Sequence, residues 1–277
     1  SAASDVYKRQ QEAADGVKEI MLDKKFGASG NHVVVEEFLT GPEVSVLSFC
    51  DGKTVKPMVS SMDHKRALDH DEGLNTGGMG TVAPNPYYTP AVAERCMQEI
   101  FLPTVAAMQA EGCPFKGCLY FGLMLTPDGP KVIEYNCRFG DPETQVVLPL
   151  LESDLLTVME ATTNGTLDKT DVKFSDGAAA CVILASGGYP LAYEKGKEIT
   201  GLTAGQLNAA DVTVYHAGTA IKDGRLVTNG GRVLGVTATA NTLPEALKKA
   251  YAATESIHFD KLHKRSDIGA RALAAMQ

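Results

Sequence analysis

The stretch GCLYFGLMLTPDGPKVIEYNCRFGDPETQ, residues 117–145, predicts a buried β-hairpin that ends in polar side chains. The apolar run over residues 119–125 and the run over 131–135 have the length and composition of strands. The Pro-Asp-Gly sequence between them, residues 127–129, is a turn signal. A polar segment follows the second strand, and Asp-Pro-Glu at 141–143 predicts the start of a helix capped by Asp141.

The end of this hairpin is the first candidate site. Because side chains alternate along a strand, Val132, Glu134 and Asn136 are expected on one face, which Arg138 extends. Carboxylate and amide oxygens suit Mg²⁺, and arginine suits the phosphate that Mg²⁺ usually accompanies. The spacing therefore indicates a Mg²⁺–phosphate site, and the alternative is a polar strand end followed by an ordinary helix cap.

Composition and charge restrict the class of protein. The chain has 277 residues, enough for two domains, and its 44% hydrophobic and 22% charged residues are typical of soluble globular proteins. The net charge is −8 without a Lys/Arg cluster, which disfavours a nucleic-acid partner. No apolar run approaches the ~20 residues needed to cross a bilayer. Six cysteines, mostly in apolar segments and without a C-x-x-C pair, indicate buried free thiols in a reducing cytosol, so we expect a cytoplasmic protein.

The rest of the chain predicts a mixture of helices and strands. Helices are expected over residues 11–22 and from Thr89 and Ser153 onward. Residues 32–59 predict strands, beginning with one that contains 33–39, and residues 60–86 predict a long polar loop. Beyond residue 176 the composition shifts to short strands and one helix, at 178–185, 212–216, 219–221, 225–227, 233–240 and 242–256.

The sequence VEEFLTGPE, residues 35–43, is a second candidate site. A strand edge that leads into a turn leaves backbone groups free to pair with a flat heterocycle such as adenine. Phe38 and Leu39 offer apolar contact, and Glu43 can accept hydrogen bonds from ribose hydroxyls. The alternative is an acidic strand end exposed to solvent.

The loop over residues 60–86 is a third candidate site. It contains the basic pair Lys65 and Arg66 and the sequence NTGGMG at 75–80. Glycine allows backbone amides to approach a phosphate closely, and the basic pair supplies positive charge. The sequence is not a P-loop, because no G-K-[ST] follows, and a flexible surface loop is the alternative.

Taken together, these stretches resemble the phosphoribosylamine–glycine ligase family of the ATP-grasp superfamily. The resemblance runs from about residue 11 to the C-terminus and is carried by VVVEEFLTGPE, DHKR, NTGGMG, EYNCRFGDPETQ, ASGGYP, HAGT and TNGGRVLGVTA. It implies an α+β fold: a partial ATP-grasp domain of antiparallel sheets with helices over residues 11–175, then a smaller β-rich domain over 176–277. It also implies that glycine and 5-phosphoribosylamine are joined with ATP through a glycyl phosphate intermediate.

The resemblance also implies which residues bind the nucleotide and its metal. The ribose of ATP would contact Glu43, and Mg²⁺ or Mn²⁺ would be held by Glu134 and Asn136. The residues expected around the adenine are Glu36, Glu37, Phe38 and Leu39.

Catalytic and substrate-binding residues follow from the same resemblance. Arg138 corresponds to the cation that faces the transferred phosphate, and Asp141 borders the acceptor site. The residues expected to bind substrate are Lys65, Arg66, Asn75, Thr76, Gly77, Gly78, Met79, Gly80 and Gly140.

The beginning of the chain departs from the family pattern. Residues 1–10 do not lead into the helix that follows, and we interpret them as a non-native or misread leader. The N-terminal α/β domain and the Gly-rich phosphate flap of the family have no counterpart in the sequence, so we expect the isolated chain to be inactive or nearly so. Two alternatives stay open: a non-catalytic module that binds nucleotide or metal, and an ATP-grasp ligase for another carboxylate and amine.

Overall fold

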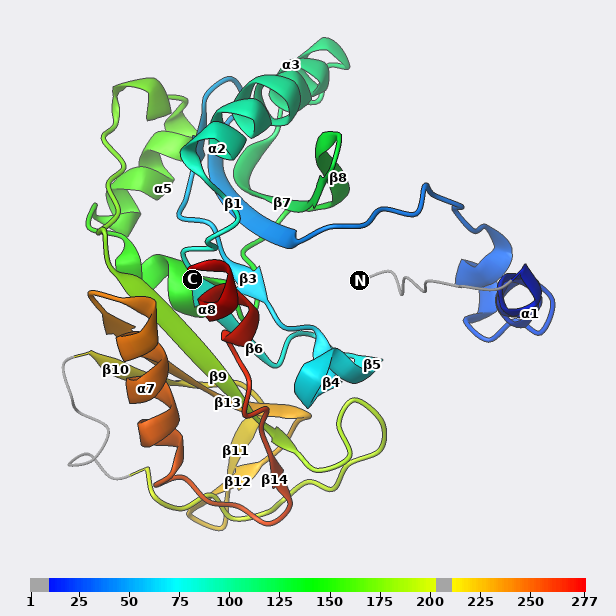
Figure 1. The fold of residues 1–277 in the computed structure, drawn as a ribbon, viewed down its shortest axis with the longest axis vertical. Helices are drawn as coiled ribbons and strands as arrows, with labels where there is room; N and C mark the ends of the chain where they lie inside the picture. The colour runs from blue at the N-terminus through cyan, green and yellow to red at the C-terminus, as the bar shows by residue number, and fades with distance from the viewer. Residues whose placement is uncertain (1–9, 203–210) are drawn as a thin grey trace. The chain divides into compact units, whose positions relative to one another are not determined.

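The computed structural model describes residues 10–202 and 211–277, which divide into two compact units, Ser1–Thr40 and Gly41–Gln277 (Figure 1). The smaller unit contains α1 (Gln10–Met21) and a 3₁₀ turn, η1 (Gly27–Asn31). The helix predicted over residues 11–22 is therefore confirmed. The predicted leader, residues 1–10, lies outside the described residues apart from Gln10.

The strand predicted over residues 33–39 is wrong. Residues 32–40 have no regular secondary structure, and the side chains of Val34, Val35 and Phe38 are 85%, 87% and 67% exposed. The apolar and β-branched composition is typical of a strand, but a strand also requires a hydrogen-bonded neighbour, and the described part of the chain supplies none here.

The predicted hairpin forms one side of the first sheet of the larger unit. Four antiparallel strands lie in the order β2-β1-β7-β8. Their bounds are β1 Glu43–Asp51, β2 Val55–Pro57, β7 Lys116–Thr126 and β8 Gly129–Asn136. The two strands of the hairpin and the turn between them are as predicted. Burial is as predicted only for β7, because β8 lies at the edge of the sheet and none of its residues is fully buried.

A β-bulge in β8 changes which side chains share a face. Gly122 pairs with Glu134, but its neighbour Leu123 pairs with Val132, so Ile133 has no partner of its own. Because an extra residue reverses the alternation, Val132 lies on the face opposite Glu134. The prediction that Val132 and Glu134 share a face is wrong, whereas Glu134 and Asn136 do share one.

Helices cover one face of this sheet (Figure 1). Thr89 caps α2 (Pro90–Cys96) by accepting a hydrogen bond from the Val92 amide, as its sequence predicts. A π-helical turn, η3 (Met97–Phe101), leads into α3 (Leu102–Ala110). Phe101 packs on Phe121 of β7 at 4.1 Å between ring centroids, within a core that contains Val132 among its partly buried members.

Residues 60–86 are more ordered than predicted. Instead of one long loop they contain β3 (Met62–Asp63), a hairpin of β4 (Arg66–Leu68) and β5 (Glu72–Asn75), and β6 (Gly80–Ala83). All four residues of β6 are buried, because this strand pairs with β3 on one side and β9 on the other. Glycine and threonine conceal this strand in the sequence, since neither gives an apolar run.

The second sheet is built from β9 outward, in the order β10-β13-β9-β6-β3, with β14 (Leu262–His263) also pairing with β9. Helix α7 (Leu243–Thr254) packs against β9 and β13 (Figure 1). The strands predicted beyond residue 176 and this helix are confirmed: β9 Ala178–Ser186, β10 Val212–His216, β11 Thr219–Lys222, β12 Arg225–Thr228 and β13 Arg232–Ala240. Strand pairing crosses the predicted domain boundary near residue 176, so that division stays a prediction.

The segment after the hairpin begins with a turn. A cis peptide bond joins Asp141 to Pro142, and α4 (Thr144–Val147) follows without a side-chain cap, so the predicted cap at Asp141 is wrong. Helix α5 (Leu155–Asn164) is capped by Asp154 and ends at Gly165 in the left-handed conformation. The remaining elements are η2 Asp69–Asp71, η4 Leu148–Leu150, η5 Leu167–Lys169 and α8 Ala270–Ala275.

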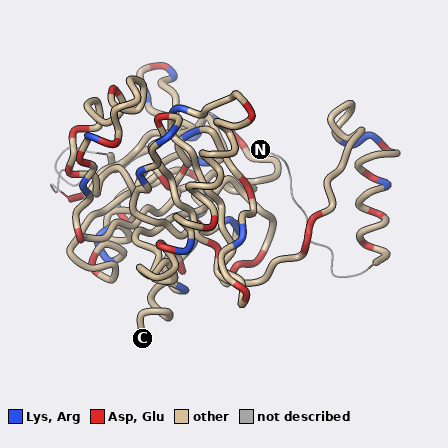
Figure 2. The backbone as a smooth tube through the Cα atoms, turned by 90° about the horizontal axis from the view of Figure 1, so that it is seen from above, with Lys and Arg blue, Asp and Glu red and all other residues tan. Residues whose placement is uncertain are grey.

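The two sheets place helices and strands in an α+β arrangement with antiparallel pairing, as expected. Acidic and basic residues are interspersed along the backbone of the larger unit (Figure 2). Within the described residues, no helix combines the length and apolar character needed to span a bilayer.

Candidate functional site

The face of the first sheet opposite α2 and α3 carries the predicted metal ligands. Glu134 and Asn136 lie side by side on β8, and the Asn136 amide nitrogen donates to Glu134 Oε1 at 3.2 Å. This hydrogen bond leaves the Asn136 amide oxygen available to another partner. A side chain at Gly122 would come within 3.1 Å of Glu134 Cγ, so glycine at this position makes room for the carboxylate.

Lys65 links this face to the segment that contains β3 and β4. Its ammonium forms an ion pair with Glu43 of β1 at 2.9 Å. Burial lowers the pKa of Lys65, but the charges of Glu43, Asp63 and Glu134 outweigh it and leave the pKa above its ordinary value. The structure therefore brings a fixed cation close to the predicted ribose contact and the predicted metal ligand.

Arg66 does not join Lys65. Its guanidinium donates to the carbonyl oxygen of Gly73 at 2.9 Å, within the β4–β5 hairpin, whereas the Lys65 ammonium contacts β1. The basic pair of the sequence is thus divided between two places. The role of Arg66 in binding a substrate phosphate stays a prediction.

Two further carboxyl groups lie beside these residues, Glu143 buried and Asp63 partly buried, and the predicted set did not include them. Glu143 is 5% exposed and accepts a hydrogen bond from the Tyr120 hydroxyl at 3.0 Å; that hydroxyl lies 2.7 Å from Ser45 Oγ. Asp63 accepts from the His64 amide at 2.8 Å. Burial raises the pKa of both carboxyls, and for Asp63 the nearby charge of Glu143 raises it further.

Sequence signals for these carboxyls were present but weak. Glu143 belongs to the polar run that begins at Glu134, and Asp63 precedes His64 in the sequence DHKR. Nothing local distinguishes a buried acid from a solvated one, because burial depends on segments distant in the sequence.

Arg138 lies near Glu143, and its positive charge lowers the pKa of that carboxyl. The Arg138 guanidinium itself is exposed and donates to the Phe139 carbonyl at 2.9 Å.

The glycine loop, residues 75–80, uses its amides within the protein. The amide of Gly77 donates to the Tyr189 hydroxyl at 2.9 Å, and the amide of Gly78 to Thr76 Oγ1 at 3.0 Å. The Met79 amide donates to the His64 carbonyl at 2.8 Å. These three donors are therefore occupied rather than exposed as a phosphate cradle.

Close packing accounts for the two glycines at the centre of this loop. A Cβ atom on Gly77 would lie 2.9 Å from Arg232 Cζ, and one on Gly78 would lie 2.6 Å from Asp63 Oδ1. Both distances are shorter than ordinary van der Waals contact, so any other residue would displace its neighbours. That the loop binds substrate stays a prediction.

Arg232, at the start of β13, joins the glycine loop to the turn that contains Asp141. Its guanidinium donates to the carbonyl oxygens of Gly77 and Asp141, both at 2.8 Å, and to Asp141 Oδ2 at 3.1 Å. The sequence motif that contains Arg232 was recognised, but its contacts lie 91 and 155 residues away and leave no local signal.

The residues expected to bind adenine, Glu36, Glu37, Phe38 and Leu39, belong to the smaller unit, whereas Glu43 belongs to the larger one. Phe38 is exposed, and Glu43 is engaged by Lys65. Their joint role around a nucleotide therefore stays a prediction.

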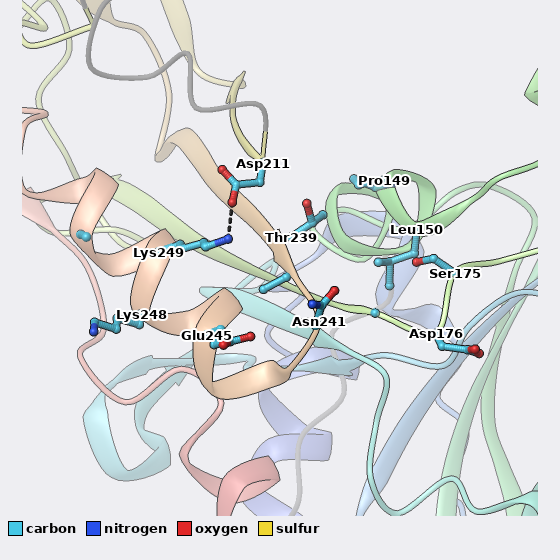
Figure 3. Close-up of a pocket in the computed structure, with 13 residues that line it drawn as sticks. Pro149, Leu150, Ser175, Asp176, Asp211, Thr239, Asn241, Glu245, Lys248 and Lys249 are labelled. Carbon is cyan, nitrogen blue, oxygen red and sulfur yellow. Dashed lines mark hydrogen bonds and ion pairs between the residues drawn. The ribbon is translucent and has the colours of Figure 1, made fainter.

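An open groove elsewhere in the larger unit contains none of the predicted site residues (Figure 3). It lies along α7 and the end of β13, where Lys249 forms an ion pair with Asp211. Its lining mixes acidic, basic and apolar side chains: Pro149, Leu150, Ser175, Asp176, Gly177, Asp211, Thr239, Ala240, Asn241, Glu245, Lys248, Lys249 and Ala252.

Sequence profiles of known families match two parts of the chain. The profile of the phosphoribosylglycinamide synthetase ATP-grasp (A) domain matches residues 3–144, and that of the phosphoribosylglycinamide synthetase C domain matches residues 179–271. The two profiles thus cover most of the chain, in the order in which the resemblance places them.

Curated relatives and a solved structure agree with these profiles. The chain is 48% identical over 268 residues to a phosphoribosylamine–glycine ligase from Vibrio vulnificus, covering 96% of this chain and 62% of the relative. It is 49% identical over 273 residues to the human trifunctional purine biosynthetic protein adenosine-3, covering 98% of this chain and 27% of that protein. The crystal structure of phosphoribosylamine–glycine ligase from Thermotoga maritima superposes with a TM-score of 0.82 at 36% identity, covering 94% of this chain and 64% of that one. The chain therefore spans less than two thirds of the length of each.

Proposed function

The chain belongs to the phosphoribosylglycinamide synthetase family, and from this premise we propose that it forms part of an enzyme that joins glycine to 5-phosphoribosylamine at the expense of ATP. The products would be glycinamide ribonucleotide, ADP and phosphate. The observation that carries the proposal is the pairing of Glu134 with Asn136 on one face of the first sheet, with the Lys65 ammonium and the carboxyls of Asp63 and Glu143 nearby.

The proposed reaction has two steps. A glycine carboxylate oxygen attacks the γ-phosphorus of ATP, and the bond from that phosphorus to the β-phosphate oxygen breaks, which gives glycyl phosphate and ADP. The nitrogen of phosphoribosylamine then attacks the acyl carbon, loses a proton and displaces phosphate. Neither step requires a protein nucleophile, so positioning and charge stabilisation are the tasks left to the protein.

The residues present fit a hard divalent cation. Glu134 offers a carboxylate and Asn136 an amide oxygen, and the described part of the chain contains no group of three or more His, Cys, Asp or Glu that could hold a metal. Two protein ligands are the arrangement expected when nucleotide phosphates and water complete the shell. Mg²⁺ or Mn²⁺ bound there would neutralise phosphate charge.

Fixed cations have the complementary task. The anionic carboxylate of glycine must approach an anionic triphosphate, and charge must be stabilised while the phosphoryl group moves. Lys65, held by Glu43, and Arg138, whose charge acts on Glu143, are the side chains we propose for it. The role of Asp141 in catalysis is part of the same proposal. The partners are small molecules, with neither nucleic acid nor membrane involved, and the protein is cytoplasmic.

Binding and turnover together test this function. Isothermal titration of the chain with Mg²⁺ and ATP should give a saturable signal that the chelator EDTA abolishes. Glycine with phosphoribosylamine should stimulate ADP release by a polypeptide in which this chain is extended to the length of its relatives, and the isolated chain should release little or none. Binding of Mg²⁺ and ATP that is absent, or that is unchanged by Glu134→Gln, would contradict the proposed nucleotide and metal site. ADP release stimulated equally by other amino acids would instead favour an ATP-grasp ligase of different specificity.

A further inference from the structure

We propose that Arg232 is a positioning residue that fixes the acceptor side of the site. Its guanidinium joins two segments, the glycine loop (residues 75–80) and the acidic turn (residues 139–143), and holds both in the arrangement that substrate meets. The inference rests on the proposed function for the identity of the substrate, whereas the contacts of Arg232 with the two segments are independent of it.

Both terminal nitrogens of the planar Arg232 guanidinium donate hydrogen bonds to these two segments. Nη1 donates to the carbonyl oxygens of Gly77 and Asp141, both at 2.8 Å, and lies 3.5 Å from the Gly78 carbonyl oxygen. Nη2 donates to Asp141 Oδ2 at 3.1 Å. The Arg232 side chain is only 19% exposed, so these hydrogen bonds are partly shielded from water and worth more than surface contacts.

The acidic turn depends on this contact for its shape. The second carboxylate oxygen of Asp141 accepts from the Gln145 amide at 2.8 Å, so both oxygens of this side chain are engaged within the protein. The turn also carries Gly140, where a Cβ atom would lie 2.4 Å from Glu143 Oε2. A shift of Asp141 would therefore move the buried carboxyl of Glu143.

The glycine loop depends on the same guanidinium. Gly77 lies flat against it, since a Cβ atom there would be 2.9 Å from Cζ. Gly78 lies against Pro142 of the acidic turn, with 2.5 Å between an added Cβ and Pro142 Cδ. The two segments thus touch each other directly, and Arg232 closes the contact from the side of β13.

Lysine would not replace this arginine. An ammonium is a single point of charge and cannot present two nitrogens in one plane to two carbonyl oxygens and a carboxylate. We therefore expect Arg232→Lys to loosen both segments almost as much as Arg232→Ala. A substitution in the preceding strand, β12, should loosen neither segment. The matched control is Arg225→Ala in β12, which removes an exposed ion pair with Glu198.

Ligand binding and hydrogen exchange test the inference on the chain as it is. The probe for the acceptor side is glycinamide ribonucleotide, and the probe for the proposed metal and nucleotide site on β8 is Mg²⁺ with ATP. For Arg232→Lys and Arg232→Ala we expect the dissociation constant of glycinamide ribonucleotide to rise by about 10- to 100-fold, the range for losing a charge-assisted hydrogen bond. The constant for Mg²⁺ with ATP should stay near that of the wild type.

Exchange and rescue separate positioning from a general loss of stability. Peptides that contain residues 75–80 and 139–145 should lose amide protection in both variants, while peptides from β9 keep it. Millimolar guanidinium chloride should restore protection and ribonucleotide binding to Arg232→Ala but not to Arg232→Lys, and sodium chloride should restore neither.

The results can overturn the inference in two ways. Unchanged protection and affinity would show that Arg232 positions nothing, and equal weakening of both ligands with protection lost throughout would show a merely structural role. If the wild type binds neither ligand, the proposed function fails. Amide hydrogen exchange in the two segments, and its rescue by guanidinium, still decides the role of Arg232.

Discussion

The candidate site has two walls, the end of β8 and the pair formed by the glycine loop and the acidic turn. They differ in how many of their polar groups are already hydrogen-bonded within the protein. On β8, Glu134 and Asn136 make one hydrogen bond to each other and leave oxygens exposed. The second wall consists of the glycine loop and the acidic turn, whose polar groups are hydrogen-bonded to Arg232 and Tyr189. We call the β8 wall the open wall, because its oxygens are free to bind a ligand. We call the other the built wall, because its polar groups are already bonded within the protein.

This difference predicts how each wall responds to change. A side chain on the open wall can be altered without loss of stability, because it is exposed and few atoms depend on it. A change in the built wall alters packing and hydrogen bonds at once, so it affects stability and binding together.

Glu134→Gln should have the largest effect, on function alone. It replaces a charged ligand by a neutral one of the same size, so metal-dependent nucleotide binding should fall by about two orders of magnitude or more, the loss typical when a charged group leaves a site. Titration of Mn²⁺ followed by electron paramagnetic resonance measures this. The free energy of unfolding should stay within about 0.5 kcal/mol of the wild type.

The control for that variant is Glu160→Gln on the exposed side of α5, which removes the same charge away from the site. It should leave Mn²⁺ binding unaltered. Equal binding by the two variants would remove Glu134 from the metal site, and a large loss of stability in Glu134→Gln would show that the β8 wall is not open.

Gly78→Ala should have the next largest effect, on stability. Gly78 has φ of +113°, and its Cβ would lie 2.5 Å from Pro142 Cδ and 2.6 Å from Asp63 Oδ1. Backbone strain and overpacking together should cost about 3 kcal/mol in urea denaturation. The matched control is Gly112→Ala, also at positive φ but with nothing within 4 Å of the added atom, which should cost only about 1 kcal/mol. Similar losses for both would mean that packing around Gly78 is loose.

The sequence predicted those features of the site that depend on residues close together in the chain. Alternation placed the hairpin strands and brought Glu134 beside Asn136, because residues two apart in a strand share a face. It failed at Val132, since the bulge at Ile133 depends on how β7 and β8 pair and leaves no trace in composition. Residues 33–39 failed in the opposite way: their composition favours a strand, but pairing needs a partner that the local sequence does not specify.

The built wall was the harder part to predict. The sequence NTGGMG was recognised, yet glycine alone does not distinguish a phosphate cradle from close packing against protein atoms. Here Arg232 and Pro142 supply those atoms from segments far from residues 75–80 in the chain, and Asp63 supplies others from β3. The buried strand β6 was missed for the same reason, because β3 and β9 bury it and its own residues are not strongly apolar.

A pH dependence follows from His64, which ties the built wall to α8. The Gly269 amide donates to His64 Nε2 at 3.0 Å, so Nδ1 carries the proton and donates to the Gly80 carbonyl at 3.1 Å. Burial, with the nearby charges of Arg271 and Arg265, lowers the pKa of His64 to about 4. The unfolded chain, with an ordinary pKa near 6.5, binds a proton more readily, so stability is complete above about pH 6.5 and declines as pH falls toward 4.

The size of this decline is up to about 3 kcal/mol, from the difference between the two pKa values. It is measured as the free energy of unfolding of the wild type minus that of His64→Asn, between pH 4 and pH 7. Asp63 and Glu143, whose pKa values are raised, contribute with the opposite sign, but they are present in both proteins and cancel in the difference. A difference that does not vary with pH would show that His64 does not titrate in this range.

Arg138→Lys should have the smallest effect of the four, and it tests where the two walls meet. The Arg138 guanidinium is exposed and donates to the Phe139 carbonyl, and its charge reaches the buried Glu143. Lysine keeps the charge and loses the planar fork, so a bidentate contact to phosphate becomes a single one. ADP release should therefore fall about tenfold, with unchanged stability, when the variant is assayed in a polypeptide extended to the length of the relatives. The matched control is Arg95→Lys on α2, whose guanidinium pairs with Glu99 at 2.8 Å away from this face. Near-normal rates for Arg138→Lys would place Arg138 outside the phosphate contacts. A fall in stability comparable to that of Gly78→Ala would instead assign it to the built wall.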